Sequence, residues 1–195
     1  MKKLLCLTTI VLMSFSTFQN EKIDRIGVKG PIIFNNTRYH LSTAQRPNVD
    51  YYFQEYVPID ETVKKFNQLI TVNVFIRNSS LENAVQQKAG ELNKRMEKDK
   101  VCNYSITQGP DGKDSIIDCV LSYEKDGEIT AAEFVIYRFK EIELQNHTRA
   151  ILIYSYSKRS YDTDIFDFFT SLPKDRKELL DLMSLQELPK IRIKE

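Results

Sequence analysis

Residues 102–119 read CNYSITQGPDGKDSIIDC, and this stretch decides the predicted fold. Its centre, Gly109-Pro110-Asp111-Gly112, has turn composition, and the two cysteines are equally distant from it. If the flanking residues pair as an antiparallel hairpin, Cys102 faces Cys119 directly and a disulfide can form. A bulged turn would shift the register by one residue, but the facing cysteines favour the unshifted pairing. Two unrelated buried thiols are the alternative.

A second hairpin is predicted at Asp126-Gly127, where Lys125 would pair with Glu128. Continued along the strands, that register places Cys119 opposite Phe134. The two hairpins then agree on one buried, mainly apolar face. This face comprises Cys102, Tyr104, Ile106, Ile117, Cys119, Leu121, Phe134 and Ile136.

The remaining chain alternates between strand and helix patterns. Ser79 and Glu82 have the spacing of a capping box at the start of a long helix. Residues 151–154 are apolar on both faces, which is typical of a strand covered on both sides. The predicted elements are a hairpin at 32–45 and 49–57, a short helix at 61–69, a strand at 71–76, a helix from Asn78, strands at 101–107, 115–124, 129–140 and 148–157, and helices at 162–171 and 174–185.

These elements predict an α+β domain in which a mainly antiparallel sheet, with an N-terminal hairpin, is packed between helices as an α/β/α sandwich. The segment YYFQEYVP at 51–58, running into Glu61-Thr62-Val63, resembles the hairpin-to-helix passage of the PsbP-like proteins. The order of elements is similar over most of the mature chain. This resemblance implies a small exported accessory protein with a binding or assembly role rather than catalysis, and it implies no functional residue.

The N-terminus predicts an exported protein. A short basic start and an apolar run from Leu4 to Phe15 are typical of a signal peptide, here assigned to 1–18, with an uncleaved anchor as the alternative. Since no second apolar run follows, we expect a periplasmic or secreted chain that is not membrane-embedded after signal removal. Residues 19–30 are polar and are expected to be a flexible segment before a single domain at 31–195. Export favours the disulfide.

Composition and motifs exclude several functions. The chain has 28 Lys and Arg against 27 Asp and Glu, so its net charge provides no general electrostatic attraction to nucleic acid. It lacks a serine nucleophile elbow, a phosphate-binding loop and a zinc cysteine pattern. We therefore expect no cofactor and no bound metal.

An alternative function, a small hydrolase or metal-dependent enzyme, would depend on His40 or on three acids. Asp162, Asp164 and Asp167 are spaced so that their oxygens could hold a hard cation such as calcium. They lack the glycine and the distal glutamate of a full calcium loop, and acids are also favourable at the start of a helix. His40 lies on a predicted strand without an obvious partner nearby in the sequence.

Tyrosines give the main binding hypothesis. Tyr52 and Tyr56 alternate with polar residues on one strand face, and Tyr39 and His40 lie on the partner strand. Exposed aromatic residues among polar ones often mark contact surfaces, although packing under a helix is equally common. We expect an exported, non-catalytic binding or assembly module with a protein or small-molecule partner.

Overall fold

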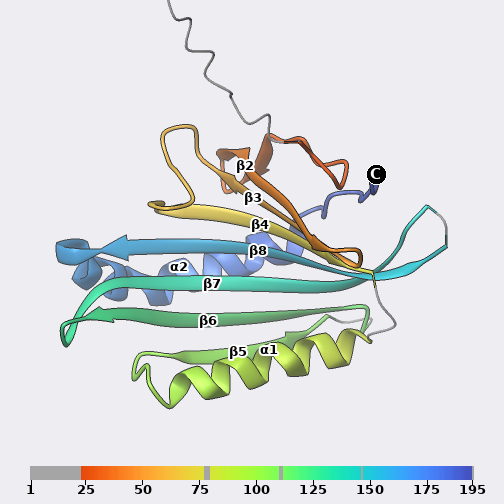
Figure 1. Ribbon diagram of the computed structural model, residues 1–195. Helices are drawn as coiled ribbons and strands as arrows, with labels where there is room; N and C mark the ends of the chain where they lie inside the picture. The colour runs from red at the N-terminus through yellow and green to blue at the C-terminus, as the bar shows by residue number, and fades with distance from the viewer. Residues whose placement is uncertain (1–22, 77–79, 110–111, 146, 195) are drawn as a thin grey trace, which may run out of the picture.

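The computed structural model describes residues 23–76, 80–109, 112–145 and 147–194. Eight strands form one antiparallel sheet in the order β1-β2-β3-β4-β8-β7-β6-β5 (Figure 1). The elements are β1 (Ile32–Phe34), β2 (Thr37–Asn48), β3 (Tyr51–Val57), β4 (Gln68–Phe75), α1 (Leu81–Met96), β5 (Asn103–Gln108), β6 (Asp114–Lys125), β7 (Glu128–Glu143), β8 (Arg149–Tyr161), a 3-10 turn η1 (Asp162–Asp164) and α2 (Ile165–Leu185). The predicted signal peptide lies outside the described residues.

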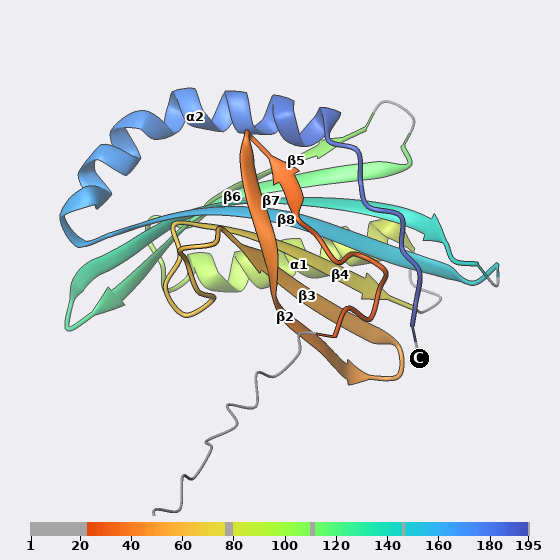
Figure 2. The same cartoon turned by 90° about the horizontal axis from the view of Figure 1, so that it is seen from above.

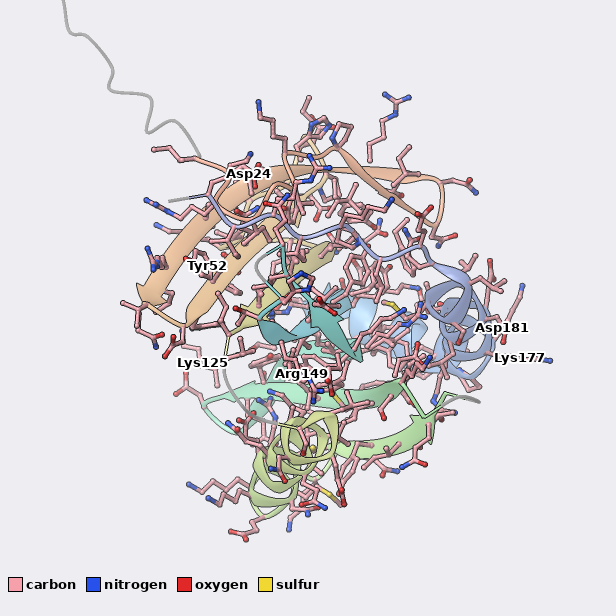
Figure 3. The ribbon with its side chains drawn as sticks, turned by 90° about the vertical axis from the view of Figure 1, so that its right-hand side faces the viewer. Asp24, Tyr52, Lys125, Arg149, Lys177 and Asp181 are labelled. Carbon is pink, nitrogen blue, oxygen red and sulfur yellow. The ribbon has the colours of Figure 1, made fainter. Side chains whose placement is uncertain are left out.

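The sheet curls into a half-barrel, so the predicted α/β/α sandwich is wrong. Helix α2 lies along the concave side, whereas α1 lies on the outer side, where it packs mainly against β5, β6 and β7 (Figures 2 and 3). Strand twist accumulates over eight strands and contributes to the bend of the sheet, and on the outer face α1 covers mainly β5, β6 and β7. The outer face of β3, β4 and β8 is consequently left without a helix.

Two separate apolar cores result from this arrangement. The concave core lies between the sheet, α2 and the terminal segments, and it includes Phe34, Phe134 and Leu179. The outer core lies between α1 and the sheet, and it includes Val85, Leu92 and both described cysteines. Within the described part of the chain, no helix is long and apolar enough to cross a membrane.

The predicted register of the first hairpin is wrong by two residues. Tyr104, not Cys102, pairs with Cys119, because the hairpin closes at the backbone bond from Gly109 N to Asp114 O, 2.9 Å long. A shift of two residues keeps both cysteines on the same face, and both are buried free thiols. Burial raises the pKa of Cys119 to about 12. The disulfide between them stays a prediction.

The second hairpin is confirmed at its turn, where Lys125 pairs with Glu128. A bulge between Tyr123 and Glu124 then shifts the register by one residue, so Cys119 faces Val135 instead of Phe134. Because of this shift, the side chains of β7 point to the sheet faces opposite to those predicted. Phe134 belongs to the concave core and Val135 to the outer core.

The expected helix at 61–69 does not form. Residues 61–67 make turns instead, and the Glu61 carboxylate accepts hydrogen bonds from Asn67 N and Gln68 N at 2.8 and 3.0 Å. The apolar residues that suggested a helical stripe, Val63 and Phe66 among them, form a small cluster with β3 and β4. The hairpin-to-helix passage implied by the PsbP-like resemblance is therefore absent.

Both long helices differ slightly from their predictions. Helix α1 is capped by Ser80, whose side chain accepts from Asn83 N, while Ser79 lies outside the described residues. Helix α2 is continuous through Pro173, where two helices were expected. Packing of Phe168 and Leu179 into the concave core fixes both halves of α2, which offsets the backbone hydrogen bond that proline cannot make.

The expected flexible segment at 19–30 is instead packed where it is described. Asp24, Ile26 and Val28 are buried, and the Asp24 carboxylate accepts a hydrogen bond from Val28 N at 2.8 Å. The C-terminal segment runs beside it, with a backbone bond from Arg192 N to Ile26 O, 2.8 Å long, and an ion pair from Lys194 Nζ to Asp24, 2.5 Å long. The two ends of the described chain therefore fasten each other (Figure 2).

Acid should destabilise the protein through Asp24, Asp99 and Asp175. Burial alone would raise the pKa of Asp24 and Asp99, but hydrogen bonds, from Lys194 to Asp24 and from Ser122 to Asp99, outweigh it and lower both. A hydrogen bond from Lys158 lowers the pKa of Asp175. The unfolded chain, with Asp pKa values of about 4, binds these protons more readily. The stabilisation is therefore fully present above about pH 4 and is lost as the pH falls further.

Urea unfolding at pH 7, 5, 4 and 3 checks this expectation. The midpoint should stay level down to about pH 5 and then fall, and Asp24→Asn should make the fall smaller. A midpoint as high at pH 3 as at pH 7 would contradict the assignment.

Candidate functional site

Two cavities of similar size lie on opposite sides of the sheet. The polar cleft, of about 520 Å³, lies between α2 and the ends of β4 and β8. The α1 groove, of about 510 Å³, lies between α1 and the outer face of the sheet. The lining of the α1 groove is Asn48, Asp50, Tyr51, Asn73, Phe75, Ala84, Gln87, Lys88, Glu91, Tyr137, Phe139, Ile151 and Ile153.

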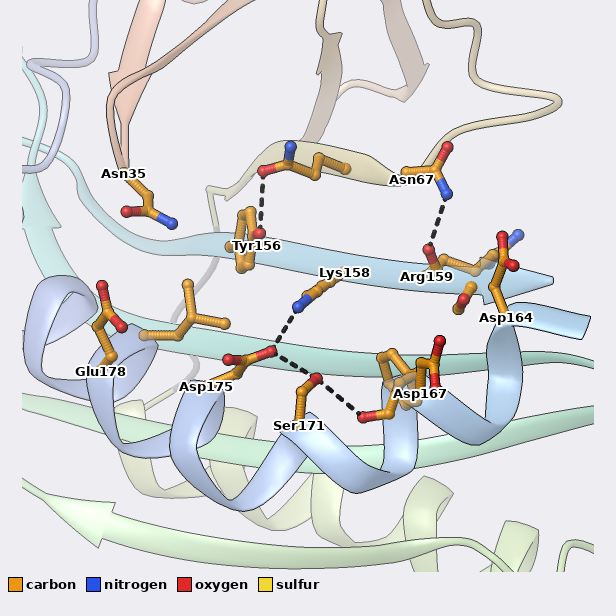
Figure 4. Close-up of a pocket in the computed structure, with 14 residues that line it drawn as sticks. Asn35, Asn67, Tyr156, Lys158, Arg159, Asp164, Asp167, Ser171, Asp175 and Glu178 are labelled. Carbon is orange, nitrogen blue, oxygen red and sulfur yellow. Dashed lines mark hydrogen bonds and ion pairs between the residues drawn. The ribbon is translucent and has the colours of Figure 1, made fainter.

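Several groups in the polar cleft already pair with one another. Lys158 Nζ donates to an Asp175 carboxylate oxygen at 2.5 Å, and Ser171 Oγ donates to the same oxygen at 2.9 Å (Figure 4). At the inner end, Gln68 Oε1 accepts from Tyr156 Oη at 3.1 Å and from Tyr39 Oη at 2.7 Å. A ligand that contacted these particular groups would have to replace their hydrogen bonds.

The structure separates the acids and the histidine of the alternative function. Asp164 and Asp167 line the polar cleft, whereas Asp162 does not. His40 is exposed on β2 and lines neither cavity. Among the described residues, no group of three His, Cys, Asp or Glu side chains could hold a metal ion.

The tyrosines predicted as a contact surface are buried in the concave core. Tyr39 and Tyr56 are 0% exposed and Tyr52 is 2% exposed. Tyr56 Oη donates to Val28 O at 2.6 Å and accepts from Gln54 Nε2 at 2.6 Å, so it fastens the N-terminal segment. Burial also raises the pKa of Tyr56. Gln54, between Tyr52 and Tyr56 on the same strand face, suggested that this face is exposed. Its side-chain amide is instead buried and hydrogen-bonded to Tyr56 and to the N-terminal segment.

Strand register builds the floor of the α1 groove. Tyr51 pairs with Phe75, and Phe75 with Ile151, which forms one apolar row across β3, β4 and β8. The next row joins Asn73 to Ile153, and Ile153 to Phe139 on β7. Because alternate residues of a strand share a face, both rows point outward on the side of α1.

Helix α1 forms one wall of the groove and supplies most of its charges. Ala84, Gln87, Lys88 and Glu91 recur at the spacing that places residues on one side of a helix. Lys88 Nζ pairs with Glu91 at 2.5 Å and lies 5.0 Å from the ring centroid of Tyr137. An apolar floor with a few polar groups around it is typical of small-molecule pockets.

Aromatic stacking and hydrogen bonds fix the other end of the floor. The rings of Tyr51 and Phe75 stack with centroids 4.4 Å apart and planes 6° from parallel. Tyr51 Oη donates to Asn73 Oδ1 at 2.7 Å, and Asn73 Nδ2 donates to Thr71 Oγ1 at 3.1 Å. The Thr71 and Ser155 hydroxyls are hydrogen-bonded at 2.6 Å, which extends the chain to β8. Burial, then the negative charge of Glu55, raises the pKa of Tyr51.

Sequence reasoning missed the α1 groove. The predicted strands contain Tyr51, Phe75 and Ile153. Whether these side chains line a groove depends on how much of the outer sheet face α1 covers, and in the predicted sandwich helices covered the whole face. The usable signal was the position of Tyr51, Phe53 and Phe75 on the outward face of 51–55 and 71–75, once the helix is placed against 117–139.

A protein-family model matches residues 26–188. The chain belongs to that family. Both cavities are built from residues within the matched segment, so they are parts of the family domain. Comparison with curated proteins and with solved structures found no match. The family match does not link the chain to the PsbP-like proteins.

Proposed function

We propose that the protein is a non-catalytic binding module that holds a small amphipathic ligand in the α1 groove. The observation that carries this proposal is an apolar and aromatic floor left open by α1, with Lys88, Glu91 and Asn73 as the polar groups around and within it. Binding would remove the partly exposed rings of Tyr51, Phe75 and Tyr137 from water, which is favourable. Export and the disulfide between Cys102 and Cys119 remain parts of the proposal.

The α1 groove supports binding better than the polar cleft does. In the cleft, Lys158, Ser171 and Asp175 satisfy one another. In the groove, Tyr51 is hydrogen-bonded to Asn73 and stacked on Phe75, and Lys88 lies over Tyr137, yet these rings are still partly exposed to water. A ligand therefore gains apolar contact in the groove with little competing loss.

Filling the groove tests the proposal. Ala84 lines it from α1, and Ala84→Trp places a large ring over the floor. We expect the wild type to bind 1-anilinonaphthalene-8-sulfonate, and Ala84→Trp to bind it at least about tenfold more weakly, as followed by probe fluorescence. Gln86→Trp is the matched control, because Gln86 is exposed on the same helix and lines neither cavity.

The two variants separate a site effect from unfolding. Circular dichroism should show equal helix and strand content in both. Equal affinity of the probe for Ala84→Trp and for the wild type would refute the proposed function, as would a folded wild type that does not bind the probe.

A further inference from the structure

Asn73 keeps unused hydrogen-bonding capacity in the floor of the α1 groove. A side-chain amide has two N–H donors and an oxygen with two lone pairs. Among the described residues, one N–H of the Asn73 amide donates to the Thr71 hydroxyl, and one lone pair of its oxygen accepts from the Tyr51 hydroxyl. One N–H and one lone pair of the same amide are therefore left for a ligand.

The surroundings of Asn73 make this capacity selective. Its cross-strand neighbours are Phe53, which does not line the groove, and Ile153, which does, and Phe75 lies two residues along β4 on the same face. A purely hydrocarbon ligand that covered Asn73 would remove water from its amide without replacing the hydrogen bonds. A ligand with a donor and an acceptor side by side would replace both.

The dimensions of the groove set the length of its occupant. Its floor extends over the four neighbouring strands β3, β4, β8 and β7. With strands about 4.8 Å apart, this distance is about 14 Å. An extended peptide advances about 3.4 Å per residue, so about four residues fit. Helix α1 bounds one end, and Asn48 and Asp50 beside the β2–β3 turn bound the other.

We propose that the ligand of the α1 groove is a short free peptide with apolar side chains, one residue of which donates its N–H to Asn73 Oδ1 and accepts from Asn73 Nδ2 at its C=O. In an extended chain the N–H and C=O of one residue point to the same side, so they offer together the donor and the acceptor that complement what Asn73 has left. Its apolar side chains contact the floor on either side. The inference rests on the proposed function, because it names the ligand class of the same groove.

The test compares a peptide with the amphipathic probe on the same variants. Acetyl-Leu-Phe-Leu-amide has about the required length, and its affinity can be measured by competition with 1-anilinonaphthalene-8-sulfonate and by calorimetry. We expect Asn73→Leu to weaken peptide binding at least about tenfold while leaving the affinity for the probe within about twofold of wild type. Asn73→Asp, which keeps an acceptor for Tyr51 but offers no N–H, should weaken it similarly.

Asn83→Leu is the matched control, because it makes the same substitution at an exposed asparagine of α1 that lines neither cavity. It should bind the peptide with no more than about a threefold loss. Equal peptide affinity in Asn73→Leu and wild type would overturn the inference. So would an absence of peptide binding to a wild type that binds the probe in the groove, and that outcome would leave the proposed function standing.

Discussion

Replacing Asp99 by alanine is expected to lower the free energy of unfolding by about 4 kcal/mol. Asp99 follows α1 and is 8% exposed. One carboxylate oxygen accepts from Val101 N, Cys102 N and Ser122 Oγ, at 3.0, 3.2 and 2.6 Å. The other accepts from Ser122 N at 2.8 Å and from Arg95 Nε at 3.0 Å. Alanine would leave Val101 N, Ser122 N and the Ser122 hydroxyl without this acceptor, whereas Cys102 N would keep its bond to the backbone oxygen of residue 99.

Two companion variants show which part of the interaction matters. Asp99→Asn keeps the shape but removes the charge, so it should cost less than alanine. Glu97→Ala changes an exposed carboxylate at the end of the same helix and should change stability by no more than about 0.5 kcal/mol. Because the chain has no tryptophan, urea unfolding is best followed by far-ultraviolet circular dichroism. A loss below about 1 kcal/mol for Asp99→Ala would contradict this role.

The second large effect is expected at Arg138, which fastens the C-terminal end of α2 to β7. Its Nη1 donates to Met183 O at 2.8 Å and to Gln186 O at 2.9 Å. Its Nε and Nη2 donate to one Asp114 oxygen at 2.9 and 2.7 Å. Arg138→Ala should lower the free energy of unfolding by about 3 kcal/mol, because it leaves a mostly buried carboxylate and two carbonyl oxygens without their donor.

Hydrogen exchange should locate the damage in the Arg138→Ala variant. Amides of residues 179–186 should exchange faster, while those of α1 should keep their protection. The double variant with Asp114→Ala should cost less than the sum of the two single changes, since it leaves no unpaired charge. Lys140→Ala, two residues along the same strand face, is the matched control. Uniform loss of protection across both helices would show that Arg138 does not act locally.

The sequence predicted strands and long helices better than it predicted how they combine. Val85 and Leu92 identified the buried stripe of α1, and Asp126-Gly127 identified the β6–β7 turn, because both patterns depend on near neighbours in the chain. The extra residue at the bulge beside Tyr123 has no comparable signature. One residue was enough to move Phe134 to the opposite core.

The candidate site depended on the same long-range information. Tyr52 and Tyr56 looked like surface residues because Gln54 lies between them, yet a buried glutamine is acceptable when its amide is fully paired. Apart from Tyr56, the partners of this amide lie 26 residues or more away, so a local pattern could not reveal the full pairing. Tyr51, on the opposite face of the same strand, lines the groove instead.

The contact between residues 24–26 and 192–194 also bears on how the chain could be re-engineered. Because these two segments run side by side, a short linker could join residue 194 to residue 23 without stretching the fold. New ends could then be opened in the exposed β6–β7 turn at Gly127. Such a circular permutant of residues 23–194 would keep every strand neighbour, and the junction between the two joined segments would become an ordinary surface loop.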